Sequence, residues 1–176
     1  MMDLIIKKKM KIIELEKFIQ NLSPDLYSFA YILIPDDLQA TQLMIDAVGS
    51  FMIQNKFKIE KWISKDRLNN LDHQSLMDDI KNSLLKLLFE ISKKRINQLK
   101  LSLSHPEEDH SFFQLEFNDK AVLYLKEKGQ LDLNQIELVT SLTRSEVLAH
   151  LYSARLQLID RLPSIYKRSL EQVSET

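Results

Sequence analysis

Apolar residues recur through most of the chain at intervals of three and four positions, which is the period of an amphipathic helix. The first such stripe comprises Ile12, Leu15, Ile19 and Leu22. Ser23-Pro24-Asp25 follows it, and a Ser at the N-cap, a Pro at the first helical position and an Asp in the first turn are typical of a helix start. We therefore expect one helix to end near residue 22 and a second to run from there to about residue 33.

Two more helices are expected in the first hundred residues. Pro35-Asp36-Asp37 predicts a turn whose aspartates cap a helix over about 38–52. Residues 54–74 are polar around Trp62 and predict a loop with one short helix. A long helix is expected over about 75–103. Its predicted inward face comprises Leu76, Ile80, Leu84, Leu87, Leu88, Ile91 and Ile96.

The last third of the chain has the clearest punctuation. Asn118 is expected to cap a helix that Gly129 ends in the left-handed conformation. A short helix starts at Asp132 or the residue after it. Thr143 and Glu146 form a capping box that starts a longer helix, whose predicted inward stripe is Val147, Leu151, Ala154 and Leu158. A short helix, a tight turn and a longer capped helix outline a helix-turn-helix, which DNA-binding domains and plain helical bundles both use.

The composition supports a fold built from long helices. The 176 residues include 2 Gly and 4 Pro, whereas strand-rich folds need many of both for their turns. An all-α fold is therefore predicted, and the scarcity of glycine argues against sites made from Gly-rich phosphate-binding loops. A sequence without Cys has no disulfide, thiol nucleophile or Cys-based zinc site. The apolar runs are too short to span a membrane and the amino terminus lacks the core of a secretory signal, so we expect a cytoplasmic protein without membrane insertion.

An acidic stretch that contains a proline, residues 105–111, divides the chain. It predicts two small helical domains over 11–100 and 118–165, joined by a linker over 101–117. Residues 1–100 hold 16 Lys and Arg against 13 Asp and Glu, and the remaining residues hold 8 against 12, so the formal charges are +3 and −4. Neither part has the dense positive charge that by itself indicates nucleic-acid binding.

Three stretches, taken in order, resemble the small two-domain bacterial sigma factors of the extracytoplasmic-function type. They are the opening helix pair from Leu26 to Ala40, the helix Ser83–Lys93 and the segment from Gln135 to Arg155. The last is similar to the family's module for reading the promoter −35 element. The positions in register with that module are Ile136, Leu142, Thr143, Val147, Leu151, Ala154 and Arg155. The resemblance covers roughly residues 24–162 and implies a domain that binds polymerase and the −10 element, followed by a helix-turn-helix domain.

The resemblance also implies site residues and partners. The helix over 143–161 would lie in the major groove of a promoter, and its DNA contacts would be Arg144, His150 and Arg155. The long helix would grip the DNA backbone near the start of melting through Lys93, Lys94 and Arg95. Core RNA polymerase would contact Leu43 and Asp46. The implied partners are core RNA polymerase and promoter DNA, with an antagonist protein of the anti-sigma type as a further one.

The departures from the family pattern fall on functional positions. Leu84 and Leu87 stand where the family has aromatic residues near the melted strand, and Ser141 stands where it has a turn glycine. A second hypothesis is therefore a sigma-like protein that acts through protein–protein contact without specific DNA binding, and a third is a DNA-binding regulator unconnected to polymerase. For the cationic residues, the alternative is a solvated helix face, with Arg155 paired to a nearby carboxylate.

Other chemistry finds little support in the sequence. No combination of nucleophile, base and acid can be assigned, so we expect neither an enzyme nor a cofactor. His105 and His110 bracket three carboxylates, but their spacing matches no established metal site, and no metal is expected.

Overall fold

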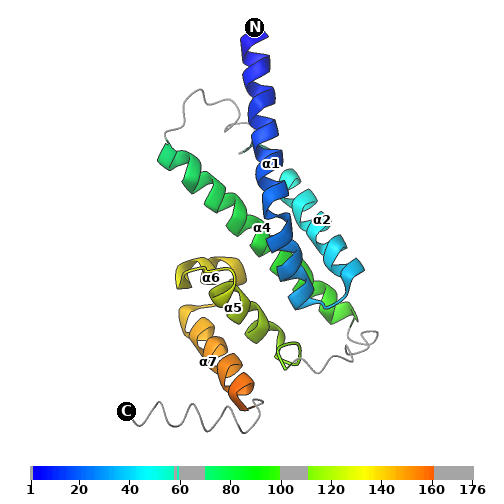
Figure 1. Cartoon of the computed structure of the whole chain (residues 1–176), viewed down its shortest axis with the longest axis vertical. Coiled ribbons are helices and arrows are strands. Elements are labelled where there is room, and N and C mark those ends of the chain that lie inside the picture. The colour runs from blue at the N-terminus through cyan, green and yellow to red at the C-terminus, as the bar shows by residue number, and fades with distance from the viewer. Residues whose placement is uncertain (1, 58, 60–69, 100–110, 161–176) are drawn as a thin grey trace. The chain divides into compact units, whose positions relative to one another are not determined.

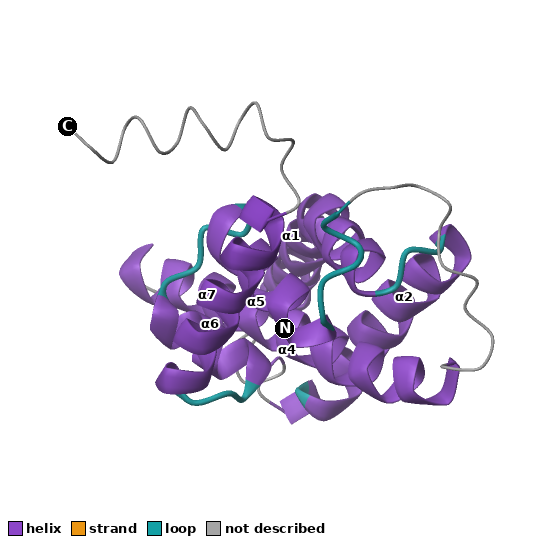
Figure 2. Ribbon diagram, turned by 90° about the horizontal axis from the view of Figure 1, so that it is seen from below, coloured by secondary structure: helices purple, strands orange, loops and turns teal. Residues whose placement is uncertain are grey.

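The structure is a computed structural model of the whole chain, and it describes all residues except 1, 58, 60–69, 100–110 and 161–176 (Figure 1). The described residues are mostly helical and contain no strand (Figure 2). The predicted all-α fold is confirmed. The chain divides into two compact units, Met1–Leu101 and Ser102–Thr176.

The first unit packs three helices against one another in pairs: α1 (Met2–Leu33), α2 (Asp37–Gln54) and α4 (Asn70–Leu99). Its core is aliphatic and aromatic, and the largest fully buried side chains are Leu26, Phe29, Leu33, Ile34, Leu43, Leu84, Leu88 and Phe89. Asp36 is the N-cap of α2, as predicted, because its carboxylate accepts a hydrogen bond of 2.8 Å from the backbone N–H of Gln39.

The predicted helix boundary at Ser23 is wrong, because α1 continues through Pro24 to Leu33. Ser23 does not act as an N-cap, since its hydroxyl donates to the carbonyl of Ile19 at 3.0 Å, one turn back in the same helix. The buried Leu15 lies eleven residues, close to three full turns, before the buried Leu26. One unbroken helix keeps both on the core side, and this packing outweighs the cost of a proline in its interior.

The second unit packs α5 (Phe117–Glu127), α6 (Leu133–Thr140) and α7 (Arg144–Asp160) against one another. The predicted capping box is present: the backbone N–H of Thr143 donates to Glu146 at 2.7 Å, and the N–H of Glu146 faces the Thr143 hydroxyl at 3.4 Å. The turn between α6 and α7 passes through Ser141, which adopts a left-handed φ of 56°.

Two predicted boundaries of α5 are wrong. Its N-cap is Glu116 rather than Asn118, which lies inside the first turn. The left-handed residue after the helix is Gln130, with φ of 54°, rather than Gly129. Glycine is needed at 129 for space instead, because a Cβ there would lie 2.8 Å from the carbonyl oxygen of Leu125.

Candidate functional site

In the second unit, one face of α7 packs against α5 and α6, and the opposite face is exposed. Val147, Leu151 and Ala154 are buried against the rest of the unit. The turn at Ser141 and the capped start of α7 fix where the helix begins. The short helix α6, the turn through Ser141 and the longer helix α7 follow one another in the order that the sequence predicts.

Both arginines predicted to contact DNA are exposed, and each has a carboxylate partner. The Arg155 guanidinium lies 2.6 Å from a carboxylate oxygen of Glu127, with both side chains more than half exposed. Arg144 lies 3.7 Å from Glu137 and donates a hydrogen bond of 3.2 Å to the side-chain oxygen of Asn134. Exposed ion pairs of this kind contribute about 0–1 kcal/mol, so a phosphate could displace either carboxylate at small cost.

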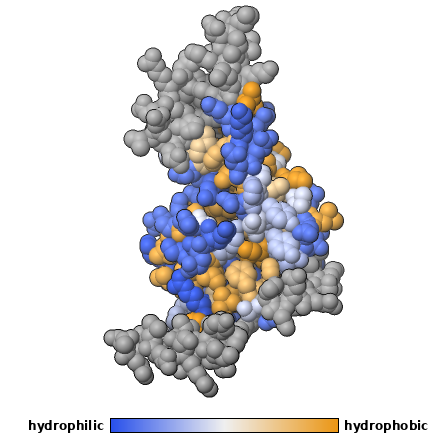
Figure 3. All heavy atoms as spheres, in the orientation of Figure 1, coloured by the Kyte–Doolittle hydropathy of each residue, from blue (hydrophilic) through white to orange (hydrophobic). Residues whose placement is uncertain are grey.

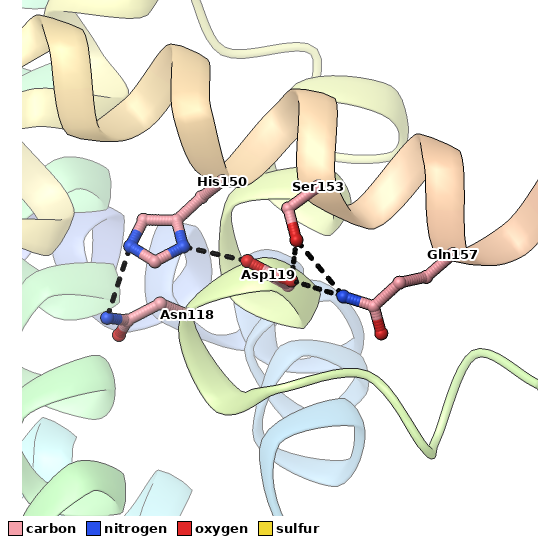
Figure 4. A network of polar contacts seen from close by, with 5 residues as sticks. All are labelled: Asn118, Asp119, His150, Ser153 and Gln157. Atoms are coloured by element: carbon pink, nitrogen blue, oxygen red, sulfur yellow. Dashed lines mark hydrogen bonds and ion pairs between the residues drawn. The ribbon is translucent and has the colours of Figure 1, made fainter.

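His150, the third predicted DNA contact, points into the unit instead. Its Nδ1 lies 2.7 Å from an oxygen of Asp119, a residue of α5 whose side chain is 4% exposed (Figure 4). Ser153 Oγ donates to the other carboxylate oxygen at 2.8 Å, and Gln157 Nε2 donates to the same oxygen at 3.0 Å. Three side chains of α7 therefore converge on one buried carboxylate of α5, and we call these four residues the Asp119 cluster.

The Asp119 cluster was not found from the sequence, although its α7 side carries a signal. His150, Ser153 and Gln157 follow at steps of three and four, which places them on one helix face. Asn118 extends the contact, with its side-chain nitrogen 3.5 Å from His150 Nε2. The cluster ties α7 to α5, and its buried carboxylate is satisfied by donors, as buried charges require.

Lys120, the neighbour of Asp119 on α5, is also buried, with 6% of its surface exposed. This burial lowers the pKa of the Lys120 ammonium, while the Glu116 carboxylate acts in the opposite direction.

The outer face of α7 is largely apolar. Leu148, Tyr152 and Leu156 follow at four-residue steps and are 50%, 68% and 42% exposed. The same line of residues ends in Arg144 at the start of the helix and Asp160 at its end. We call these five residues the α7 ridge.

The cationic residues predicted on the long helix lie along the last third of α4. Lys93 and Lys94 are exposed, and the Lys93 ammonium lies 5.8 Å from the centre of the Phe89 ring, a cation–π contact. Arg95 is partly buried, and its guanidinium lies 2.6 Å from the carboxylate of Asp46 on α2. The structure thus pairs a predicted DNA contact with a predicted polymerase contact.

Leu43, the other predicted polymerase contact, is fully buried in the core of the first unit. The outward side of α2 instead presents Leu38, Ile45 and Met52, one every seven residues, with exposures of 76%, 54% and 43%. Gly49 lies among them, and the space around the position of its missing Cβ is open to at least 4 Å. We call these four residues the α2 outer face.

The α2 outer face is also poor in charge. Of the 18 residues of α2, two are charged, Asp37 and Asp46. Both carboxylates already have partners, since the Tyr27 hydroxyl donates to Asp37 at 2.5 Å and Arg95 pairs with Asp46. The hydrogen bond to Asp37 raises the pKa of the Tyr27 hydroxyl. In Figure 3, apolar side chains lie among hydrophilic ones on the face shown.

Some predicted features lie outside the described residues, namely His105, His110 and Trp62. Within the described part of the chain, no three His, Asp or Glu side chains lie close enough to hold a metal ion. Among the same residues, no helix has the length and apolar character needed to cross a membrane.

Neither the protein-family models nor the curated proteins compared with the chain give a match.

Proposed function

We propose that this protein is a cytoplasmic transcription initiation factor of the sigma type that binds core RNA polymerase and promoter DNA. The observation that carries the proposal is the α2 outer face, an exposed and nearly uncharged surface on the helix that carries Leu43 and Asp46, the two residues that the family resemblance assigns to polymerase contact. A helix that exposes a row of apolar side chains of this size is typical of a protein–protein contact.

In this proposal, polymerase binds the α2 outer face rather than the buried Leu43. Leu38, Ile45 and Met52 supply the apolar contact, and Gly49 lets a partner helix approach the backbone of α2 closely. Asp46 lies at the margin of this surface, with 34% of its side chain exposed. It supplies the acidic contact once its pair with Arg95 opens.

Promoter DNA would contact two sets of cationic residues. Arg144 and Arg155 at the outer side of α7 bind phosphates or bases, and each exchanges its carboxylate partner for DNA. Lys93, Lys94 and Arg95 bind the DNA backbone from α4. With few phosphate contacts, both the affinity and its dependence on salt are modest.

A second function is favoured by the α7 ridge. Its centre is apolar where a DNA-reading helix normally carries polar side chains, and the flanking arginines are neutralised by glutamates. These features support a sigma-like protein that works through protein–protein contact without specific DNA binding.

Binding to core RNA polymerase tests the first part of the proposal. Ile45→Glu places a charge in the α2 outer face and should weaken binding at least tenfold, whereas Ile13→Glu, on an exposed position of α1, should not. Equal binding of both variants and the parent chain, or no binding by any of them, would refute polymerase docking through α2.

Binding to promoter-like duplex across a salt series separates the two functions. Glu127→Gln releases Arg155 and should strengthen DNA binding, and Arg155→Gln should weaken it. Absence of binding to duplex at low salt, together with retained polymerase binding, would favour the protein-contact function.

A further inference from the structure

The N-terminal part of α1 extends beyond the core of the first unit. Of the α1 side chains that the structure describes, Leu15 is the first buried one, and Ile12 and Ile13 just before it are 38% and 39% exposed. The helix begins at Met2, so about 20 Å of it, at 1.5 Å per residue, precede Leu15. Figure 1 shows this part of α1 continuing past the end of α2. We call residues 2–14 the α1 extension.

The helical register indicates that the apolar core does not continue into the α1 extension. Leu15 and Leu26 are both buried and lie eleven residues apart, close to three full turns, so they mark the core side of α1. Four and seven positions before Leu15, the same side of the helix carries Lys11 and Lys8. Lysine is almost never fully buried without a partner, so the core of the first unit ends at Leu15.

The α1 extension has an apolar stripe on the side away from that core. Four apolar residues follow at steps of four, four and three, and by register they share one side of the helix. These residues, which we call the α1 stripe, are Met2, Ile6, Met10 and Ile13. Ile13 is two residues from Leu15, and successive residues of a helix are about 100° apart. The α1 stripe is therefore nearly opposite the core side and takes no part in the packing of the first unit.

Positive charge accompanies the α1 stripe. Residues 4–13 hold four lysines and no Asp or Glu. By register, Lys9 lies at one edge of the stripe and Lys7 beyond the other. Glu14 and Glu16 follow and are exposed, so the positive charge is concentrated in the part of the helix that precedes the core. An apolar stripe edged by lysines is typical of a helix that lies in the interface of an anionic lipid bilayer.

The end of α2 adds apolar surface at the same end of the first unit. α2 packs antiparallel to α1 after a short turn, so its end lies at the level of about residue 16 of α1 (Figure 1). Ile53 and Phe57 at this end are 80% and 82% exposed, the highest values among the large apolar side chains that the structure describes. Lys56 beside Phe57 is exposed as well. Two neighbouring segments of the first unit thus combine exposed apolar residues with lysine.

We propose that this end of the first unit binds the surface of an anionic lipid membrane. The α1 stripe lies in the boundary between headgroups and acyl chains, and the lysines contact anionic headgroups, each strengthening binding by roughly fivefold. The helix lies on the bilayer and does not cross it, because the lysines interrupt the run of roughly 20 apolar residues that a spanning helix needs. This binding does not depend on polymerase or promoter DNA, and it goes beyond the proposed function.

Two other occupants of the α1 stripe are disfavoured by its composition. A nucleic acid would attract the lysines, but phosphates and sugars are contacted mainly by polar and charged groups, so the aliphatic stripe would stay unused. A second copy of the chain would cover the stripe, but it would bring one lysine cluster against another of the same charge. A bilayer with anionic headgroups satisfies both the apolar residues and the lysines.

Flotation of the full-length chain with lipid vesicles tests the proposal. Vesicles of equal parts phosphatidylglycerol and phosphatidylcholine should bind at least tenfold more tightly than vesicles of phosphatidylcholine alone. The triple variant Lys7→Gln/Lys8→Gln/Lys9→Gln should weaken binding to the anionic vesicles at least tenfold. The matched control Lys81→Gln/Lys86→Gln/Lys128→Gln removes the same charge elsewhere and should leave binding within about twofold of the parent chain.

Ile13→Glu tests the apolar contact and separates this proposal from polymerase binding. It places a carboxylate in the α1 stripe and should weaken vesicle binding at least tenfold while leaving polymerase binding unchanged. Ile45→Glu in the α2 outer face should have the reverse effect. Failure of membrane binding and failure of polymerase docking are therefore distinguishable with the same two variants.

Tryptophan fluorescence tests whether the α1 stripe enters the bilayer. The sequence has one tryptophan, Trp62, so Trp62→Phe provides a silent background. In that background, Ile13→Trp should shift its emission to shorter wavelength on addition of anionic vesicles and should be quenched by brominated lipid. Ile45→Trp in the same background should show neither change.

Three results would overturn the proposal. One is the absence of binding to the anionic vesicles at low salt. Another is vesicle binding that the lysine triple variant abolishes and Ile13→Glu leaves unchanged, which would indicate a site for polyanions such as nucleic acid. The third is self-association without lipid that Ile13→Glu abolishes, which would mean that a second copy covers the α1 stripe.

Discussion

Replacing Asp119 by alanine removes the one buried carboxylate on which three side chains of α7 converge. His150, Ser153 and Gln157 donate to it over distances of 2.7 to 3.0 Å. We expect Asp119→Ala to loosen the contact between α5 and α7 and to destabilise the second unit, while the first unit keeps its stability.

The size of the effect follows from the burial of each partner. Hydrogen bonds to a charged group contribute about 1.5–3 kcal/mol each. The sum of three such bonds is therefore an upper bound for the stability that Asp119→Ala removes. The His150 side chain is 29% exposed, so it regains water when the carboxylate is lost. Removing Asp119 also relieves the cost of burying its charge. We therefore expect a loss of about 2–4 kcal/mol, larger than an average point mutation.

Hydrogen exchange measured by mass spectrometry on peptides from α7 reads the second unit separately from the first. A loss of 2–4 kcal/mol corresponds to exchange about 30-fold to 1,000-fold faster, since about 1.4 kcal/mol is a factor of ten. Glu127→Ala is the matched control, because it also removes a carboxylate of α5 that pairs with α7. Its pair with Arg155 is exposed, so its effect should stay below about 1 kcal/mol.

Asp119→Asn gives a further check on the role of charge. An amide oxygen can still accept from His150, but the amide nitrogen is a donor that faces the Gln157 donor. Its effect should lie between those of alanine at 119 and of the Glu127 control. If Asp119→Ala accelerates exchange in α7 no more than Glu127→Ala does, the cluster does not hold α7, and our interpretation of the buried carboxylate is wrong.

Other substitutions give smaller, separate tests. Gly49→Ala should stabilise the first unit by about 1 kcal/mol, because the site is open and glycine is a poor helix former. Gly129→Ala should destabilise the second unit by about 1–3 kcal/mol, because the added Cβ would meet the Leu125 carbonyl. Urea unfolding checks both. Burial lowers the pKa of Lys120, so the unfolded chain binds more protons between that lowered value and about 10.4, and stability rises with pH across this range. Lys120→Met should remove this rise and raise the melting temperature near neutral pH. Thr143→Ala should cost the second unit about 1 kcal/mol through loss of the N-cap, again measured by urea unfolding.

The helical periodicity was sufficient to predict most of the fold. The stripe of α7 and the capping box at its start lie where the sequence places them, because both depend on residues three and four apart. The errors occurred where packing outweighs a local signal. Ser23-Pro24 has the local sequence of a helix start, yet Leu15 and Leu26 share one core face, and a single helix serves both.

The candidate site was less predictable, because its contacts join residues far apart in the sequence. In the structure, Leu43 is buried on the same face of α2 as Ala40 and Ala47. Helical periodicity groups these three residues on one face, but the sequence alone does not say that this face meets α1 and α4. In the Asp119 cluster, Asp119 and its partners on α7 are 31 to 38 positions apart in the sequence. A polar stripe on α7 could be recognised, whereas its carboxylate partner on α5 could not.

The partners of the cationic residues could not be predicted from the sequence either, because they too lie far away along the chain. These partners decide which cationic residues the proposed function can use. Arg95 and Arg155 meet their carboxylates across 49 and 28 positions. Opening an exposed pair such as Arg155 with Glu127 costs about 0–1 kcal/mol, less than a phosphate contact returns. Pulling His150 away would take one of three hydrogen-bond partners from the buried Asp119, at a cost of about 1–3 kcal/mol. In the proposed function, the DNA contacts of α7 therefore come from the arginines, and His150 instead holds the helix that presents them.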